Sequence, residues 1–115
     1  MADPTIDLAT YKELQDTAGA DFVKELVDTF LEEAPTMLSD MGAALASKDA
    51  DKFRRAAHSL KSNSNTFGAL GLAAIAKSLE LGGLDSALAA GARALEALAL
   101  EYSRVAAALK ELRDA

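Results

Sequence analysis

Cysteine, aromatic residues and long apolar segments are missing or scarce in this sequence. None of the 115 residues is cysteine, which excludes a disulfide scaffold and thiol chemistry. No segment approaches the roughly 18 consecutive apolar residues of a transmembrane helix, and the residues after Met1 do not form a signal peptide. We therefore expect a soluble, cytoplasmic protein that does not enter a membrane.

Signals for β-strands are also weak. Aromatic residues make up 5% of the sequence, β-branched residues are few, and no segment alternates polar and apolar positions. Apolar residues recur instead at spacings of three and four, which is the period of an amphipathic helix. Half of the residues are hydrophobic, so we expect a single domain over residues 1–115 that buries roughly two-thirds of its unfolded surface.

The periodic segments predict five helices separated by short links. Their expected limits are about 8–16, 22–46, 50–66, 70–81 and 86–113, with aspartates at positions 7, 21, 49 and 85 as N-caps. Gly82 and Gly83 should end the fourth helix. Pro35 should bend the second helix without ending it, because the apolar spacing keeps its phase across the proline.

The second and third helices carry most of the predicted core. The stripe of the second helix is Phe22, Leu26, Phe30, Ala34, Met37, Met41 and Leu45. The stripe of the third is Phe53, Ala56, Ala57, Leu60, Ser64 and Phe67. The predicted fold class is all-α: an antiparallel up-down four-helix bundle with a short additional N-terminal helix over one end.

Charge is unevenly distributed along the chain. The net charge of −6 argues against nucleic-acid binding, because phosphate backbones bind basic surfaces. The segment from Lys48 to Lys61 nevertheless has five basic and two acidic residues, a local balance of +3 that leaves −9 on the remainder. This basic segment contains the one histidine of the sequence, His58.

His58 is predicted to lie on the solvent-exposed face of the third helix. At 100° per residue it falls roughly 140–150° from the centre of that helix's apolar stripe. Lys61 follows one turn later on the same face, and Ser62 and Asn65 extend this face with little bulk. A neutral imidazole is a good nucleophile, and the ammonium beside it could pair with an anion held on the ring. From the residues alone, an ordinary solvated helix face is the alternative.

The segment AAHSLKSNSNTFGA, residues 56–69, resembles the phosphoacceptor motif of histidine-containing phosphotransfer (HPt) domains of two-component phosphorelays. That motif reads approximately A-H-x-L-K-G-x-x-x-x-x-G-A. The positions in register are Ala57, His58, Leu60, Lys61, Gly68 and Ala69. The segments FLEEAPTML, FRRAAH and IDLATYKEL are also similar to the family, so the resemblance covers essentially the whole chain.

The resemblance implies a role for each matching residue. His58 would accept a phosphoryl group on Nε2, and Lys61 would stabilise that group. Gly68 would allow tight packing where the third helix turns into the fourth. The family usually has glycine after the lysine, which leaves space for a docking partner. This chain has Ser62 at that position, and its small side chain reduces that space slightly.

The resemblance also implies the partners. The donor would be a phosphoaspartate of a response-regulator receiver domain or a hybrid sensor histidine kinase, and the acceptor another receiver aspartate. The sequence has no phosphate-binding loop of the G-x-x-x-x-G-K type, so we expect a stoichiometric carrier without its own ATP site rather than an enzyme. We expect a monomer with no bound cofactor, and Mg²⁺ on the partner receiver domain.

The surface that docks a partner is less constrained by the sequence. Leu31 and Leu38 could contact a receiver domain, or they could simply form the margin of the core. Arg54 and Arg55 could face the acidic pocket of a receiver, or they could belong to a solvated charged face. Ser62 and Asn65 complete the candidate partner-binding residues.

Two other classes of function compete with phosphotransfer. A helical interaction module needs neither His58 nor Lys61, and the presence of both argues against it. An enzyme with His58 as general acid–base is disfavoured, because no carboxylate lies in the same helical turn and no nucleophile or cleft is evident. A second histidine is missing, as are all cysteines, so we predict no metal site.

Overall fold

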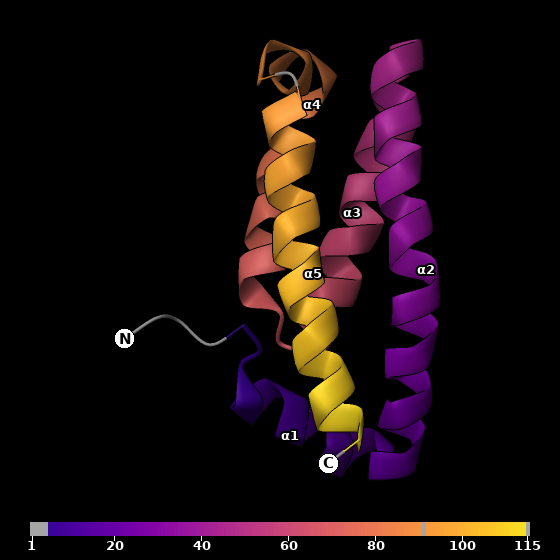
Figure 1. Cartoon of the computed structure of the whole chain (residues 1–115), viewed down its shortest axis with the longest axis vertical. Helices are drawn as coiled ribbons and strands as arrows, with labels where there is room; N and C mark the ends of the chain where they lie inside the picture. The colour runs from indigo at the N-terminus through magenta and orange to yellow at the C-terminus, as the bar shows by residue number, and fades with distance from the viewer. Residues whose placement is uncertain (1–4, 91, 115) are drawn as a thin grey trace.

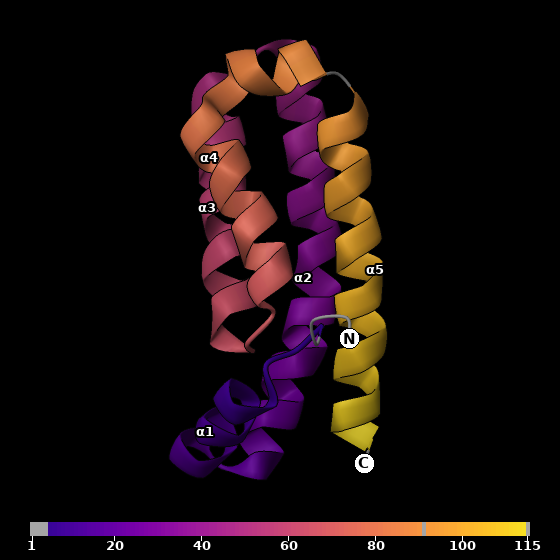
Figure 2. The ribbon, with the colours of Figure 1, turned by 90° about the vertical axis from the view of Figure 1, so that its left-hand side faces the viewer.

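The computed structural model describes residues 5–90 and 92–114, and it is all-α in these ranges. Its five helices there are α1 (Leu8–Ala18), α2 (Ala20–Ser47), α3 (Ala50–Thr66), α4 (Leu70–Ala90) and α5 (Ala92–Asp114). The four longer helices lie side by side, successive ones run in opposite directions, and α1 lies near the end where α5 finishes (Figures 1 and 2). None of the described helices combines the length and the apolar character that crossing a membrane requires.

The core face of α2 differs from the predicted stripe. Phe30 and Met41 are buried as predicted, but Phe22 is 51% exposed and Val23 and Val27 are buried instead. Apolar residues occupy adjacent positions at 22–23 and again at 26–27, so spacing alone does not determine which member faces inward. The packing of α2 against α3 and α5 determines the rotation.

α3 has the predicted limits and the predicted core face. The stripe is buried except for Ala56, which is partly buried. The Asp49 carboxylate accepts a hydrogen bond from the Lys52 backbone N–H at 3.0 Å, which confirms it as the N-cap. The buried Ser64 hydroxyl donates to the Leu60 carbonyl oxygen at 2.7 Å, so this polar group in the core is satisfied.

The N-caps predicted for the first two helices do not form as expected. Asp7 precedes α1, but its carboxylate accepts from the Thr10 hydroxyl and makes no capping bond to a backbone N–H. α2 begins at Ala20, so Asp21 lies inside the first turn and is not the cap. Its negative charge there still interacts favourably with the positive end of the helix dipole.

The predicted start of the last helix at Asp85 is wrong. The backbone turns sharply at Gly83, with φ 73° and ψ −174°, a conformation that glycine adopts far more readily than other residues. Helical structure then resumes and continues to Ala90, and α5 begins only at Ala92. Leu84 and Ala87, one turn apart, are buried, which explains why this short segment packs on the bundle instead of extending α5.

Pro35 lies inside α2, which continues through it without interruption. Proline has no N–H, so the Leu31 carbonyl loses its intrahelical donor. The Tyr102 hydroxyl of α5 points at this carbonyl oxygen from 3.5 Å. A side chain from a neighbouring helix therefore offers a weak substitute for the missing bond.

We predict that Tyr102→Phe lowers the free energy of unfolding by about 0.5–1 kcal/mol, because it removes this donor and leaves the ring packing in place. Urea denaturation provides the measurement. Pro35→Ala is the matched background, because an alanine at this position has a backbone N–H that can donate to the Leu31 carbonyl. The loss caused by Tyr102→Phe should shrink in that background. An undiminished loss would show that the hydroxyl acts elsewhere.

Candidate functional site

His58 lies on the outer face of α3, as predicted. Its side chain is 57% exposed, whereas its neighbour Ala57 is fully buried. Lys61, one turn later on the same face, is less exposed, at 24% of its side chain. The helix therefore presents the imidazole to solvent and holds the lysine closer to the body of the bundle.

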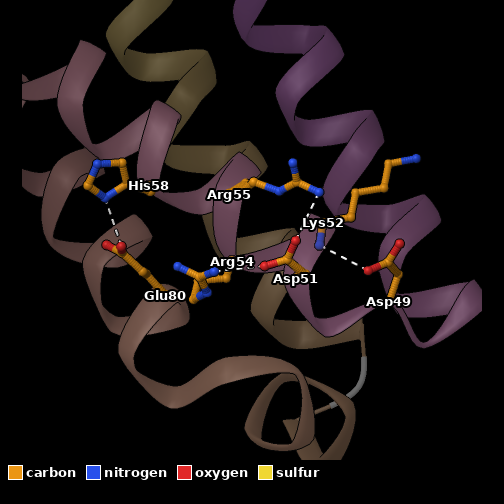
Figure 3. A network of polar contacts seen from close by, with 7 residues as sticks. All are labelled: Asp49, Asp51, Lys52, Arg54, Arg55, His58 and Glu80. Atoms are coloured by element: carbon orange, nitrogen blue, oxygen red, sulfur yellow. Dashed lines mark hydrogen bonds and ion pairs between the residues drawn. The ribbon is translucent and has the colours of Figure 1, made fainter.

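A carboxylate from α4 joins the two residues. Glu80 Oε2 lies 2.8 Å from His58 Nδ1, and Glu80 Oε1 lies 2.8 Å from Lys61 Nζ. Figure 3 shows the imidazole facing Glu80 through this nitrogen, while its other ring nitrogen points away. Sequence reasoning found no carboxylate in the helical turn of His58 and missed Glu80. It lies 22 positions later, and only the antiparallel packing of α3 and α4 brings the two residues together.

Glu80 is held in the ionised form. Its side chain is 15% exposed, and Oε1 is shielded from solvent without a hydrogen bond of good geometry in the described part of the chain. The Lys61 ammonium has the largest effect and lowers the pKa of Glu80 below its ordinary value of 4.5. Burial raises this pKa, and the contact with His58 lowers it further. The carboxylate is therefore negatively charged at neutral pH.

The charge on Glu80 assigns the tautomer of His58. An ionised carboxylate only accepts hydrogen bonds, so the Nδ1 that faces it must carry the proton. In a neutral ring with the proton on Nδ1, the lone pair is on Nε2. Nε2 is thus the ring nitrogen with an available lone pair, and it points away from the carboxylate (Figure 3).

The structure places the remaining candidate residues in different surroundings. Ser62 and Asn65 are exposed on α3, as expected. Leu31 and Leu38 are partly buried and pack against the core. This position agrees with the alternative assignment, in which they form the margin of the core. Their docking role stays a prediction.

Arg54 and Arg55 share one carboxylate. Arg54 Nη2 lies 2.7 Å from Asp51 Oδ1, and Arg55 Nη2 lies 2.9 Å from Asp51 Oδ2 (Figure 3). Their side chains remain 58% and 70% exposed. Exposed ion pairs of this kind are weak, so both guanidinium groups are available to a docking partner at little cost.

Gly68 occupies the turn between α3 and α4 in a left-handed conformation, with φ +79°. A Cβ at this position would lie 2.8 Å from the Asp7 carbonyl oxygen and 3.0 Å from Thr10 Cβ. The Gly68 carbonyl accepts a hydrogen bond from the Asp7 N–H at 2.8 Å. Gly68 therefore packs closely against the start of α1. Its predicted role in the packing of α3 against α4 stays a prediction.

Within residues 5–90 and 92–114, no three carboxylate, imidazole or thiol side chains lie close enough together to hold a metal ion. The site described above consists of one imidazole, one ammonium and one carboxylate. Such a set can provide a nucleophile, a charge for an anion and a fixed proton position.

A sequence model of the Hpt domain family matches residues 25–115, which include His58, Lys61 and Glu80. The chain belongs to the Hpt domain family. Its structure is similar to the crystal structure of histidine-containing phosphotransfer protein B (HptB) from Pseudomonas aeruginosa PAO1. The TM-score is 0.89 at 30% sequence identity, over 98% of this chain and 97% of that one. A comparison with curated proteins gave no match.

Membership of the Hpt family confirms the resemblance found in the motif of residues 56–69. The family match begins at residue 25 within α2, so it covers most of α2 and all of α3, α4 and α5 but not α1. The likeness to HptB extends further and takes in 98% of the chain. The exposed histidine and its two charged neighbours therefore belong to an Hpt domain.

Proposed function

We propose that this Hpt domain is a phosphorelay carrier that accepts a phosphoryl group on Nε2 of His58 and passes it on. Hpt proteins carry phosphoryl groups rather than turn over a small substrate, and the similarity to HptB supports that role here. The contact between Nδ1 and Glu80 carries the assignment, because in the neutral ring it places the proton on Nδ1 and leaves the lone pair on Nε2.

The transfer step needs little machinery from this chain. The lone pair of Nε2 attacks the phosphorus of a receiver's phosphoaspartate; the N–P bond forms, the P–O bond to the aspartate breaks, and the aspartate leaves as a carboxylate. The proton on Nδ1 stays in its bond to Glu80, which stabilises the positive ring. Transfer to the next receiver reverses these steps at a new aspartate.

Lys61 would change partner when the phosphoryl group arrives. In the resting protein its ammonium lies 2.8 Å from Glu80 Oε1, in an ion pair whose geometry is poor for a hydrogen bond. A phosphoryl group brings close to two negative charges, which outweigh the single charge of the carboxylate. Lys61 would therefore turn toward the phosphoryl oxygens, while Glu80 keeps its bond to Nδ1.

The partner would be the receiver domain of a response regulator or a hybrid sensor kinase, with Mg²⁺ held by the receiver's own carboxylates. Ser62 and Asn65 are small or medium-sized residues on the face of His58, and Arg54, Arg55, Leu31 and Leu38 are the other candidate docking residues. The carrier would act as a monomeric single domain in the cytoplasm, built as an up-down four-helix bundle with α1 over one end, and without an ATP site of its own.

Transfer from a receiver domain tests the proposal. The protein is mixed with phosphorylated receiver domains and Mg²⁺, and the label that it acquires is examined for stability in acid and base. We expect label that is lost in acid and kept in base, as for a phosphoramidate. Failure to acquire such label from several receivers and sensor kinases would leave a helical interaction module as the better description.

We also predict that the residue at position 80 acts through a hydrogen-bond acceptor. Glu80→Gln keeps an acceptor for the Nδ1 proton, so its initial rate of labelling should stay within about threefold of the wild type. Glu80→Ala removes the acceptor and leaves the tautomer unspecified, so the rate should fall about tenfold. Equal losses in both variants, with unchanged unfolding curves, would show that the charge and not the acceptor matters.

A further inference from the structure

A groove between α3 and α4 begins one helical turn from His58. We call it the α3–α4 groove; its volume is about 250 Å³, and it is lined by Lys61, Asn65, Leu70, Ala73, Ala74 and Lys77. Two alanines form part of its wall, so little bulk fills the space between the two lysines. Leu70, at one end, is 53% exposed.

The pairing of α3 with α4 sets one lysine opposite the other. His58 faces Glu80 in an antiparallel pair of helices, so the residue one turn after His58 faces the residue one turn before Glu80. Those residues are Lys61 and Lys77, and both line the groove. Like charges that face each other across a helix pair repel, which makes an anion between them favourable.

The carboxylate at this end of the groove does not neutralise both lysines. Glu80 contacts Lys61 and His58 with its two oxygens. Lys77 is exposed and takes part in no ion pair within residues 5–90 and 92–114. In a chain with a net charge of −6, this groove therefore has a local excess of positive charge.

We propose that the α3–α4 groove receives an acidic side chain of the docking receiver domain, with Lys77 as a specificity-determining residue. This inference rests on the proposed function, because the groove opens beside the histidine that the receiver must reach. The Lys77 ammonium and the Asn65 amide suit a carboxylate, and the apolar surface of Leu70 suits the methylene groups that carry it.

The test compares rates of transfer from the phosphorylated protein to a receiver domain that accepts phosphate from the wild type. Lys77→Ala should lower the second-order rate at limiting receiver by about 3- to 10-fold at low salt, and the difference should shrink as salt is added. The maximal rate at saturating receiver should stay unchanged, because Lys77 acts on docking and not on the phosphoryl group. Lys77→Glu should give a larger loss, and replacing the matching receiver carboxylate by lysine should restore the rate.

Lys110→Ala is the matched control, since Lys110 is an exposed lysine on α5. Equal rates for Lys77→Ala and Lys110→Ala would overturn the inference and leave the proposed function standing. A lower maximal rate or a shorter phosphohistidine lifetime in Lys77→Ala would also overturn it, because the groove would then serve the phosphoryl group. Wild-type protein that never acquires label would refute both the inference and the proposed function.

Discussion

His58→Gln should abolish phosphoryl transfer from receiver domains to this protein. An amide side chain has no nucleophilic nitrogen, and the sequence holds no other histidine. The His58 side chain is 57% exposed, so the substitution should change the free energy of unfolding by no more than about 0.5 kcal/mol. The measurement is the label acquired after mixing with a phosphorylated receiver and Mg²⁺, alongside unfolding curves of both proteins.

Lys61→Ala should be measured together with His58→Gln. It removes the ammonium from Glu80 but leaves the Nδ1 contact and the nucleophile. Labelling of Lys61→Ala should be slowed rather than lost. Comparing the two variants therefore distinguishes the residue that accepts the phosphoryl group from the residue that stabilises it. Label on the His58→Gln protein at the wild-type level would place the acceptor elsewhere.

Gly68→Ala should lower the free energy of unfolding by about 2–4 kcal/mol. Two costs combine at this position. A Cβ is strained at φ +79°, and it would lie 2.8 Å from the Asp7 carbonyl oxygen, a backbone atom that cannot move without disturbing the start of α1. The hydrogen bond from the Asp7 N–H to the Gly68 carbonyl would be disturbed as well. Urea denaturation, with the midpoint and the slope compared, gives the value.

Gly19→Ala separates the two costs. Gly19 also has positive φ, at +96°, but a Cβ there would meet nothing within 4 Å. It should therefore show the backbone strain alone, about 1–3 kcal/mol, and lose less stability than Gly68→Ala. If the two variants lose the same stability, the contact between Gly68 and the start of α1 contributes nothing, and Gly68 is an ordinary turn glycine.

Local features of the sequence determined the helices and the face on which His58 lies. The limits of α3, its N-cap Asp49 and its buried stripe all follow from residues within one or two turns of each other. Helical periodicity is a local property, because each backbone hydrogen bond of a helix joins residues four positions apart. The motif in α3 is equally local, and it was enough to identify the family.

Only the tertiary structure determined how the helices are rotated and paired. Adjacent apolar residues such as Phe22 and Val23 gave α2 two possible core faces, and packing against its neighbours selected the second. The bend at Gly83 kept residues 84–90 out of α5 because Leu84 and Ala87 could be buried. Neither choice is set by contacts within a single helix.

The same reason explains what the sequence did not reveal about the site. His58 and Lys61 lie one turn apart and could be paired by helical geometry alone. Glu80 and Lys77 come from another helix, and their positions opposite His58 and Lys61 depend on the register between α3 and α4. That register results from the packing of two complete helices, which no short segment encodes. The candidate acceptor His58 was therefore evident from the sequence, whereas the carboxylate that faces its Nδ1 was found only in the folded protein.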